Sequence, residues 1–462
     1  MNSRRMERAA GAAAGRDAVA DLRSALRRPG AGTPARLLVL GRDDAADLTG
    51  VAASVVRRPC PEQVDDGPFD AILWTADAAS VDAGACRRVR DLLEADGRLV
   101  LLGQAAAPAP DGAVTRRLVR ALSEAGFVVV KELAPEALVA RRDDFVVRPF
   151  QPGDEDAVAR LFADSFHVER PAAHWRWKYQ ENPYGGRYAS LAWAPGGELA
   201  CHYAGYPMPF WRDGRAVLGL QMGDTMTAPS WRHVGRGTSS LLARTVRHFF
   251  AVHRRGPSAF FYGFNTGGIQ RFCRWFIGGS RAEPVCYRAR DATAPPGSPP
   301  YRVERVARVD RRWDRFFARV AGHYGFLARR DAEYLDWRYL RCPDPLPYVT
   351  LAAWRWGRLV GWGVFRRRED RIVWGDALLD PRHAGAAGAL LAGALAAPEL
   401  AGGRRVEGWF PGRPAFLDAE LDRLGFESLP HPDGLGLMYL PDGEDDPPLD
   451  RLYYTMGDGD LF

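Results

Sequence analysis

The chain has almost no lysine. Only two of its 63 basic residues are lysines, Lys131 and Lys178, and the other 61 are arginines. Because a P-loop needs a lysine after its glycines, and neither lysine has that setting, an NTPase of this class is excluded. The formal net charge is +6, but no dense basic helix with interleaved aromatic residues occurs, so we expect no DNA partner.

Cysteine is also sparse. The six cysteines are widely separated and form no Cys-x-x-Cys pair, so neither a disulfide framework nor a metal site is expected, and a reducing cytoplasm is the expected compartment. No run of about 18 apolar residues occurs, so we expect no membrane span. Residues 1–33, rich in Arg, Ala and Gly, lack the apolar stretch of a signal peptide and are expected to form a frayed tail.

Residues 34–143 alternate strand and helix signals. Strands are expected over 35–41, 69–74, 97–103 and 126–130, and a helix over 86–94. This order predicts an α/β domain with a parallel sheet. Residues 92–100 resemble a passage of Rossmann-like methyltransferases, but Arg42-Asp43-Asp44 stand where a glycine-rich cofactor turn is needed. We interpret the domain as a degenerate Rossmann-like scaffold or docking module, with a live methyltransferase as the alternative.

The most informative segment is a strand, a glycine-containing turn and a helix. Residues 222–227 have the pattern of a strand, and Arg232-x-x-Gly235-x-Gly237 follows. Apolar residues over 239–252 then recur at the spacing of one helical face. Glycine lets the main chain approach a ligand closely, and the N–H groups at a helix start favour anions. The segment therefore predicts a pyrophosphate site.

This segment resembles the [Gln/Arg]-x-x-Gly-x-[Gly/Ala] coenzyme A loop of the GNAT superfamily of N-acetyltransferases. The strand over 258–265 and the helix over 266–276 resemble the family's fifth strand and fourth helix, whose splayed junction with the preceding strand admits the pantetheine arm. The resemblance implies acetyl-CoA or another acyl-CoA as co-substrate. It assigns these residues to its binding: Met226, Thr227, Arg232, His233, Val234, Gly235, Arg236, Gly237, Thr238 and Asn265.

An internal repeat supports the resemblance. The segment Trp177–Pro183 recurs as Trp337–Pro343, at an offset of 160, and Gly223-Asp224 recurs as Gly375-Asp376, at an offset of 152. A fixed period of this kind indicates duplicated units, here two tandem GNAT-like domains. The second copy has Arg382-x-x-Gly385-x-Ala387 within an Ala/Gly-rich run. We interpret it as a degenerate domain that shapes the cleft of the first, with a second active site as the alternative.

The predicted fold class is therefore α/β and α+β, an N-terminal Rossmann-like parallel sheet followed by two GNAT-like mixed-sheet domains. The predicted boundaries are a tail over 1–33, the degenerate Rossmann-like domain over 34–143, the acyl-CoA-binding GNAT-like domain over 144–292, a proline-rich linker over 293–300 and the degenerate GNAT-like domain over 301–462.

Acyl transfer to an amine needs a proton acceptor for the amine and a proton donor for the leaving thiolate. Asp224 is the first candidate base, because burial would raise its pKa. The alternative is that Asp224 is a structural hydrogen-bond acceptor, as the matching Asp376 suggests. Glu181 is a further candidate. The resemblance implies that a Tyr seven residues after Asn265 acts as the general acid, but that position is Phe272. Tyr262 is the candidate that replaces it as general acid, and the alternative is that Tyr262 is a packing residue of the core.

The sequence thus predicts an acyl-CoA-dependent N-acyltransferase that moves an acetyl or short acyl group to the amine of a small or carrier-bound metabolite, in a specialised biosynthetic pathway. One alternative is an aminoacyl transferase of tandem GNAT fold that takes its donor from aminoacyl-tRNA. An intact pyrophosphate turn argues against it, because a tRNA donor has no coenzyme A. The other alternative is a non-catalytic binding or assembly module.

Overall fold

The computed structural model describes residues 26, 34, 36–41, 52–104, 113–134, 137–232, 234–235, 237, 240–254, 256–277, 281–297, 301–344, 346–442 and 449–462. His233, Arg236 and Thr238 of the predicted turn lie outside these residues, as do 298–300 of the predicted linker and all of the predicted tail except Leu26. Contacts divide the chain into two compact units. Unit 1 comprises Met1–Arg148, Leu191–His202 and Met226–His248, and unit 2 comprises Pro149–Ser190, Tyr203–Thr225 and Phe249–Phe462.

A six-stranded sheet forms the first part of unit 1, in the order β2-β1-β3-β4-β6-β5. The strands are β1 (Arg36–Leu40), β2 (Ser54–Arg58), β3 (Phe69–Asp77), β4 (Leu93–Gln104), β5 (Phe127–Ala134) and β6 (Ala137–Arg142). The first four run parallel, and β6 runs antiparallel to β4 and β5. With α2 (Ala83–Asp91) and α3 (Ala113–Glu124), this confirms the predicted strands and helix. The antiparallel β6 was not predicted.

The rest of unit 1 packs against this region through a small apolar cluster. Val128 and Phe145 belong to the same buried cluster as Ala192, Val234 and Leu241. The guanidinium of Arg141 lies 4.8 Å from the ring of Trp231, and Arg244 forms an ion pair with Asp143. The predicted glycine turn therefore shares a compact unit with the N-terminal sheet, and a boundary at 143 does not separate the two.

A second, nine-stranded sheet has the main order β12-β21-β11-β10-β9-β15-β22, with β8 against β9 and β7 against β8. Its strands are β7 (Val146–Pro149), β8 (Tyr188–Trp193), β9 (Leu199–Arg212), β10 (Arg215–Thr227), β11 (Phe260–Asn265), β12 (Arg281–Pro284), β15 (Phe326–Ala328), β21 (Gly436–Pro441) and β22 (Leu452–Tyr453). The accompanying helices are α4 (Glu155–Phe166), α5 (Ala172–Tyr179), α6 (Leu241–His253) and α7 (Gly267–Phe276). Strands β10 and β11 and helices α6 and α7 confirm the elements predicted around the turn.

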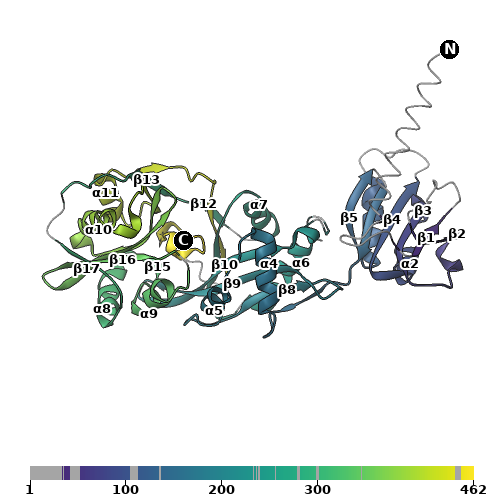
Figure 1. The fold of residues 1–462 in the computed structure, drawn as a ribbon, viewed down its shortest axis with the longest axis horizontal. Helices are drawn as coiled ribbons and strands as arrows, with labels where there is room; N and C mark the ends of the chain where they lie inside the picture. Colours follow the sequence, from purple (N-terminus) through teal and green to yellow (C-terminus); the bar gives the residue numbers. More distant parts are fainter. Residues whose placement is uncertain are drawn as a thin grey trace, which may run out of the picture. The chain divides into compact units, whose positions relative to one another are not determined.

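A third sheet lies within unit 2, in the order β14-β16-β17-β18-β19-β13-β20. Its strands are β13 (Tyr287–Asp291), β14 (Arg302–Arg305), β16 (Val349–Arg355), β17 (Arg358–Arg368), β18 (Arg371–Leu379), β19 (Arg405–Trp409) and β20 (Glu427–Leu429). The helices α8 (Arg311–Val320), α9 (Ala332–Leu335), α10 (Ala386–Leu395) and α11 (Ala415–Arg423) belong to the same part of the chain, and α10 packs across β14, β16 and β17 (Figure 1). The protein is thus a mixed α/β structure with several sheets, as the fold class predicted.

The strands of unit 2 do not keep to the predicted boundaries. Strand β13, from the predicted first GNAT-like domain, lies between β19 and β20 of the third sheet. Strand β21, from the predicted second domain, lies between β11 and β12 of the second sheet and runs antiparallel to both. The predicted linker therefore does not divide one sheet from the other. The chain before the linker supplies β13 to the third sheet, and the chain after it supplies β21 to the second sheet.

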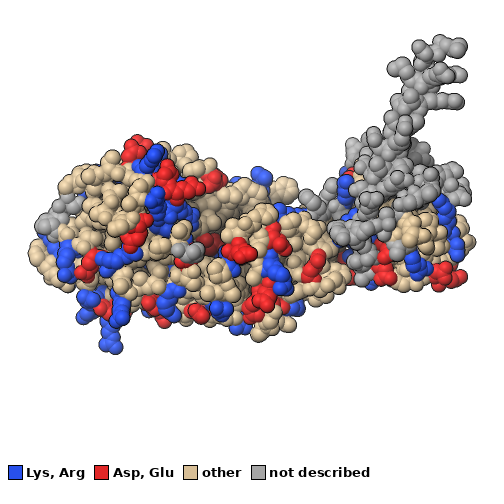
Figure 2. Space-filling model, viewed as in Figure 1, with Lys and Arg blue, Asp and Glu red and all other residues tan. Residues whose placement is uncertain are grey.

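The helices of the described residues include none that is long and apolar enough to cross a membrane. On the face drawn in Figure 2, basic and acidic side chains of the described residues are interspersed, so that face carries no extended band of one sign.

Candidate functional site

The predicted glycine turn uses the conformations that favour glycine. Gly235 has φ 70° and Gly237 has φ 55°, in the left-handed region that side chains with a Cβ rarely adopt. The N–H of Gly235 donates to the carbonyl of Val129 over 3.2 Å. The N–H of Gly235 is therefore already bonded within the protein, because a main-chain oxygen of β5 accepts its hydrogen bond.

The other described residues of the turn have local roles. Met226 is buried, and Thr227, the last residue of β10, accepts a hydrogen bond at its carbonyl from Arg232 Nε over 3.1 Å. Val234 is buried and accepts from the N–H of Leu241, where α6 begins. In unit 2, Asn265 ends β11 as predicted. The assignment of these residues to coenzyme A binding stays a prediction.

Asp224 lies at the centre of a charged group in unit 2. Its φ of 51° is unusual for a residue with a side chain, and the side chain is only 5% exposed. Its Oδ2 accepts hydrogen bonds from Arg170 Nη1 at 2.7 Å, Lys178 Nζ at 3.0 Å and Tyr179 Oη at 2.8 Å. Two cations so close stabilise the ionised carboxylate. This geometry fits the structural acceptor better than a free general base.

The repeated segment builds a matching group around Asp376. Its Oδ1 accepts from Arg330 Nε at 2.8 Å, and its Oδ2 accepts from Tyr339 Oη at 2.6 Å. Arg330 and Tyr339 stand 160 residues after Arg170 and Tyr179, the offset already seen for the tryptophans. The sequence reasoning missed both arginines, although extending the repeat a few residues upstream would have found them.

One short segment completes both groups. Asp460 accepts from Lys178 Nζ at 3.2 Å, and Asp458 accepts from Arg330 Nη2 at 2.6 Å. Residues 456–462 therefore supply one carboxylate to each copy of the charged group. Arg338, which corresponds to Lys178, does not bond Asp376 and instead donates to the carbonyls of Gly457 and Gly459.

The repeated tryptophans pair with each other. Trp177 Nε1 donates to the carbonyl of Trp337 at 2.6 Å, and Trp337 Nε1 donates to the carbonyl of Trp177 at 3.0 Å. The two rings stack with centroids 5.3 Å apart and an interplanar angle of 22°. The arrangement is reciprocal and buried, so these residues belong to the core of unit 2.

The remaining catalytic candidates are less well placed. Tyr262 is buried and its hydroxyl donates to the carbonyl of Asp458 at 2.9 Å, and burial raises its pKa well above the usual value. Glu181 is exposed just after α5. Neither residue is among those that line the charged cavity of unit 2, so their catalytic roles stay predictions.

A cavity of about 250 Å³ in unit 2 adjoins the Asp224 group. Its lining includes five cationic side chains and three carboxylates. The cations are Arg170, Lys178, Arg338, Arg366 and Arg368, and the carboxylates are Glu169, Asp344 and Asp460. The sequence reasoning did not predict this cavity, because its lining comes from segments that are far apart in the chain.

His174 also lines this cavity. Its Nδ1 is buried and has no hydrogen-bond partner among the described residues. Burial lowers its pKa to about 4, and the nearby Arg170 and Lys178 act in the same direction. The imidazole is therefore neutral at pH 7 and can accept a proton or a hydrogen bond.

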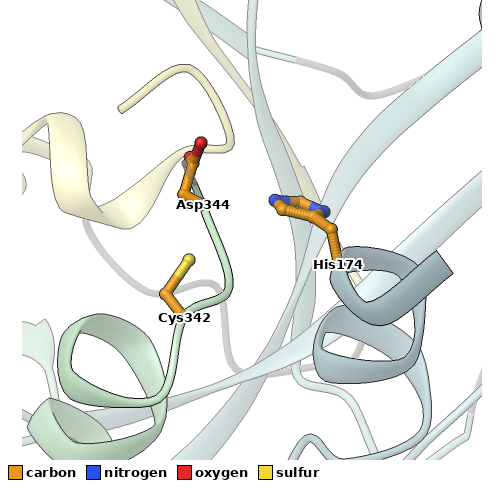
Figure 3. A group of neighbouring side chains, drawn as sticks. All are labelled: His174, Cys342 and Asp344. Atoms are coloured by element: carbon orange, nitrogen blue, oxygen red, sulfur yellow. The ribbon is translucent and has the colours of Figure 1, made fainter. Parts of the chain in front are cut away.

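Figure 3 shows an imidazole nitrogen of His174 directed toward Cys342 and Asp344. The potential ligand atoms of these residues lie within 4.8 Å of one another, a nitrogen, sulfur and oxygen set that suits zinc. However, Asp344 already accepts from both Nη atoms of Arg366 at 3.0 Å, and burial raises the pKa of the Cys342 thiol. The surrounding positive charge opposes a divalent cation here.

No family model and no curated protein matches the chain. Similar solved structures include a GCN5-related N-acetyltransferase from Anabaena variabilis, with 12% identity over 64% of this chain and 72% of that one, and a TM-score of 0.45. A second, from Kribbella flavida, has 18% identity over 64% and 70%, with a TM-score of 0.44. The N-myristoyltransferase of Saccharomyces cerevisiae with bound myristoyl-CoA has 10% identity over 66% and 84%, with a TM-score of 0.44.

Proposed function

We propose that the protein is an acyl-CoA-dependent N-acyltransferase built on two tandem GNAT-like copies, and that the first copy holds the acyl-CoA. The observation that carries this proposal is the parting of β10 from β11. The two strands pair in parallel only over Gly219–Gln221 and Phe260–Tyr262, although both continue further. A thioester lying between the parted strands would come close to the Asp224 group, two of whose partners line the cavity.

The second copy supports a degenerate role. Strands β18 and β19 also part, after Val373 and Glu407. Beyond that point, Tyr324 Oη donates to the carbonyl of Leu379 at 3.0 Å and accepts from its N–H at 2.9 Å, and Tyr453 Oη donates to the carbonyl of Ala377 at 2.9 Å. These tyrosines occupy the strand edge that a pantetheine arm would need, so we assign acyl-CoA to the first copy.

The proposed reaction forms a C–N bond to the acyl carbon as the C–S bond breaks. The nitrogen loses a proton after attack, and the leaving thiolate takes one up. His174 is neutral and lines the cavity, so it can accept a hydrogen bond from the approaching amine. Asp224 holds Arg170 and Lys178 in place at the same cavity.

Calorimetric titration with acetyl-CoA tests the proposal. Gly237→Trp places a bulky side chain in the predicted turn, and Gly434→Trp is the matched control, because both glycines have positive φ and open space at the Cβ position. We expect at least about a tenfold loss of affinity for Gly237→Trp alone. Release of free coenzyme A thiol with an amine then reports transfer. Failure of the wild type to bind acetyl-CoA contradicts the proposal.

A non-catalytic binding module is the second candidate. Three hydrogen bonds within the protein favour it, because they occupy the Asp224 carboxylate, the Tyr262 hydroxyl and the Gly235 N–H. Acetyl-CoA that binds but never releases thiol with any amine supports the module. An aminoacyl-tRNA donor is distinguished by a salt-sensitive gel shift with charged tRNA in the absence of acetyl-CoA binding.

A further inference from the structure

We propose that the cavity of unit 2 takes an acceptor amine that also carries an anionic group, a carboxylate or a phosphate. The role of this amine as an acyl acceptor rests on the proposed acyltransferase function. The anion site itself rests on the charged side chains that line the cavity.

Most of the cations in the cavity are matched by carboxylates. Arg170 and Lys178 share Asp224, and Lys178 also bonds Asp460. Arg366 is matched by Asp344, whose two oxygens it binds. These contacts neutralise three of the five cationic side chains.

Of the other two cations, Arg368 has no carboxylate partner among the residues that the structure describes. Arg338 donates to the carbonyls of Gly457 and Gly459, to a main-chain oxygen of Phe462 and to the Tyr348 hydroxyl. Arg368 donates to the carbonyl of Leu461. A carbonyl orients a guanidinium without cancelling its charge, so Arg368 keeps a charge in the cavity that no carboxylate contact among the described residues compensates.

Arg368 is the better placed of the two for a ligand. It stands two residues after Arg366 on β17, and alternate residues of a strand share a face. Burial lowers its pKa, and the neighbouring Arg366 adds to this effect. A bound anion would relieve both. The planar guanidinium matches carboxylate and phosphate oxygens with two parallel hydrogen bonds.

The same cavity offers acceptors for an ammonium or amine. Asp460 contributes a carboxylate, and His174 contributes a neutral imidazole with an unbonded nitrogen. A volume of about 250 Å³ is below the roughly 300–1,000 Å³ of sites for drug-sized ligands, so it suits a small metabolite. A small aminocarboxylate or aminophosphate meets all of these conditions.

Saturation-transfer NMR with three probes tests the inference on the full chain. β-Alanine carries a carboxylate, O-phosphoethanolamine carries a phosphate, and n-propylamine carries neither. We expect binding of one or both anionic amines and none of propylamine, and the tighter of the two anionic probes identifies the anionic group. The variants are Arg368→Gln, Arg368→Lys and the control Arg358→Gln, an exposed arginine of the same strand.

We expect Arg368→Gln to weaken binding of the anionic probe by about tenfold, Arg368→Lys to weaken it less, and Arg358→Gln to leave it unchanged. Propylamine binding as well as the anionic amines, or no effect of either Arg368 substitution, overturns the inference. Acetyl-CoA titration is run on the same samples. If the anionic amines bind but acetyl-CoA does not, the proposed function is contradicted and the anion site stands. If acetyl-CoA binds but the anionic amines do not, the anion site alone is contradicted.

Discussion

Replacing Asp224 with Asn tests how much the charged group depends on one carboxylate. Asn tolerates a positive φ, so the main chain keeps its conformation. Arg170 loses the carboxylate that it contacts, while Lys178, only 2% exposed, keeps Asp460 at 3.2 Å. Removing one partner of a buried ion pair costs about 3–5 kcal/mol. Because Asp460 remains, we expect the lower end, about 3 kcal/mol.

The assay is thermal unfolding followed by near-ultraviolet circular dichroism, which reports on the packed tryptophans. In domains of 150–250 residues, 1 kcal/mol lowers Tm by about 2–4 °C, so the expected decrease is roughly 6–12 °C. Asp376→Asn is the matched variant. Arg330 would keep Asp458 at 2.6 Å, so we expect a loss of the same order.

Activity separates the two roles of Asp224. If it only positions the cations, both variants lose activity in line with their folded fraction. If it is the general base, Asp224→Asn alone loses about 10²- to 10⁴-fold in rate while folded. A Tm unchanged by Asp224→Asn would refute the reasoning, because Lys178 and Arg170 would then not depend on the carboxylate.

Three other expectations concern the same region. Burial lowers the pKa of His174 to about 4, below its usual 6.5. The stability that the neutral imidazole contributes is therefore complete above pH 6.5 and is lost as the pH falls toward 4. Urea unfolding at several pH values should show that His174→Gln removes at most about 3 kcal/mol of this loss of stability in acid. Trp337→Phe leaves the buried carbonyl of Trp177 without its donor and should cost about 1–3 kcal/mol by denaturant unfolding, with a similar loss for Trp177→Phe; no loss in either contradicts the reciprocal pairing. Equilibrium dialysis with Zn²⁺ should retain no stoichiometric metal, and retained zinc that Cys342→Ser removes would contradict the charge argument.

The local elements were predictable because their patterns are local. Residues 36–40 and 260–265 are short apolar strands, and α6 follows a single apolar face. The repeat also located Asp376, whose contacts match those of Asp224. Periodicity and offsets of this kind need no knowledge of which segments meet in space.

The long-range contacts were not predictable from such patterns. The capture of the Gly235 N–H needs Val129, more than a hundred residues away. His174 and Asp344 meet although they are still further apart in the sequence, so no spacing in the sequence marks the cavity or the group of His174, Cys342 and Asp344. The partner of a strand is likewise chosen by the folded chain, and for this reason the predicted boundary at 293–300 did not divide the sheets.

The exchange of β13 and β21 makes the two halves of unit 2 interdependent. A chain cut after Asp291 would give an upstream fragment whose β11 and β12 lack the strand between them, and a downstream fragment with nothing between β19 and β20. Open sheet edges of this kind favour aggregation. The two fragments should therefore be recovered as a complex when produced together, and each should be insoluble when produced alone.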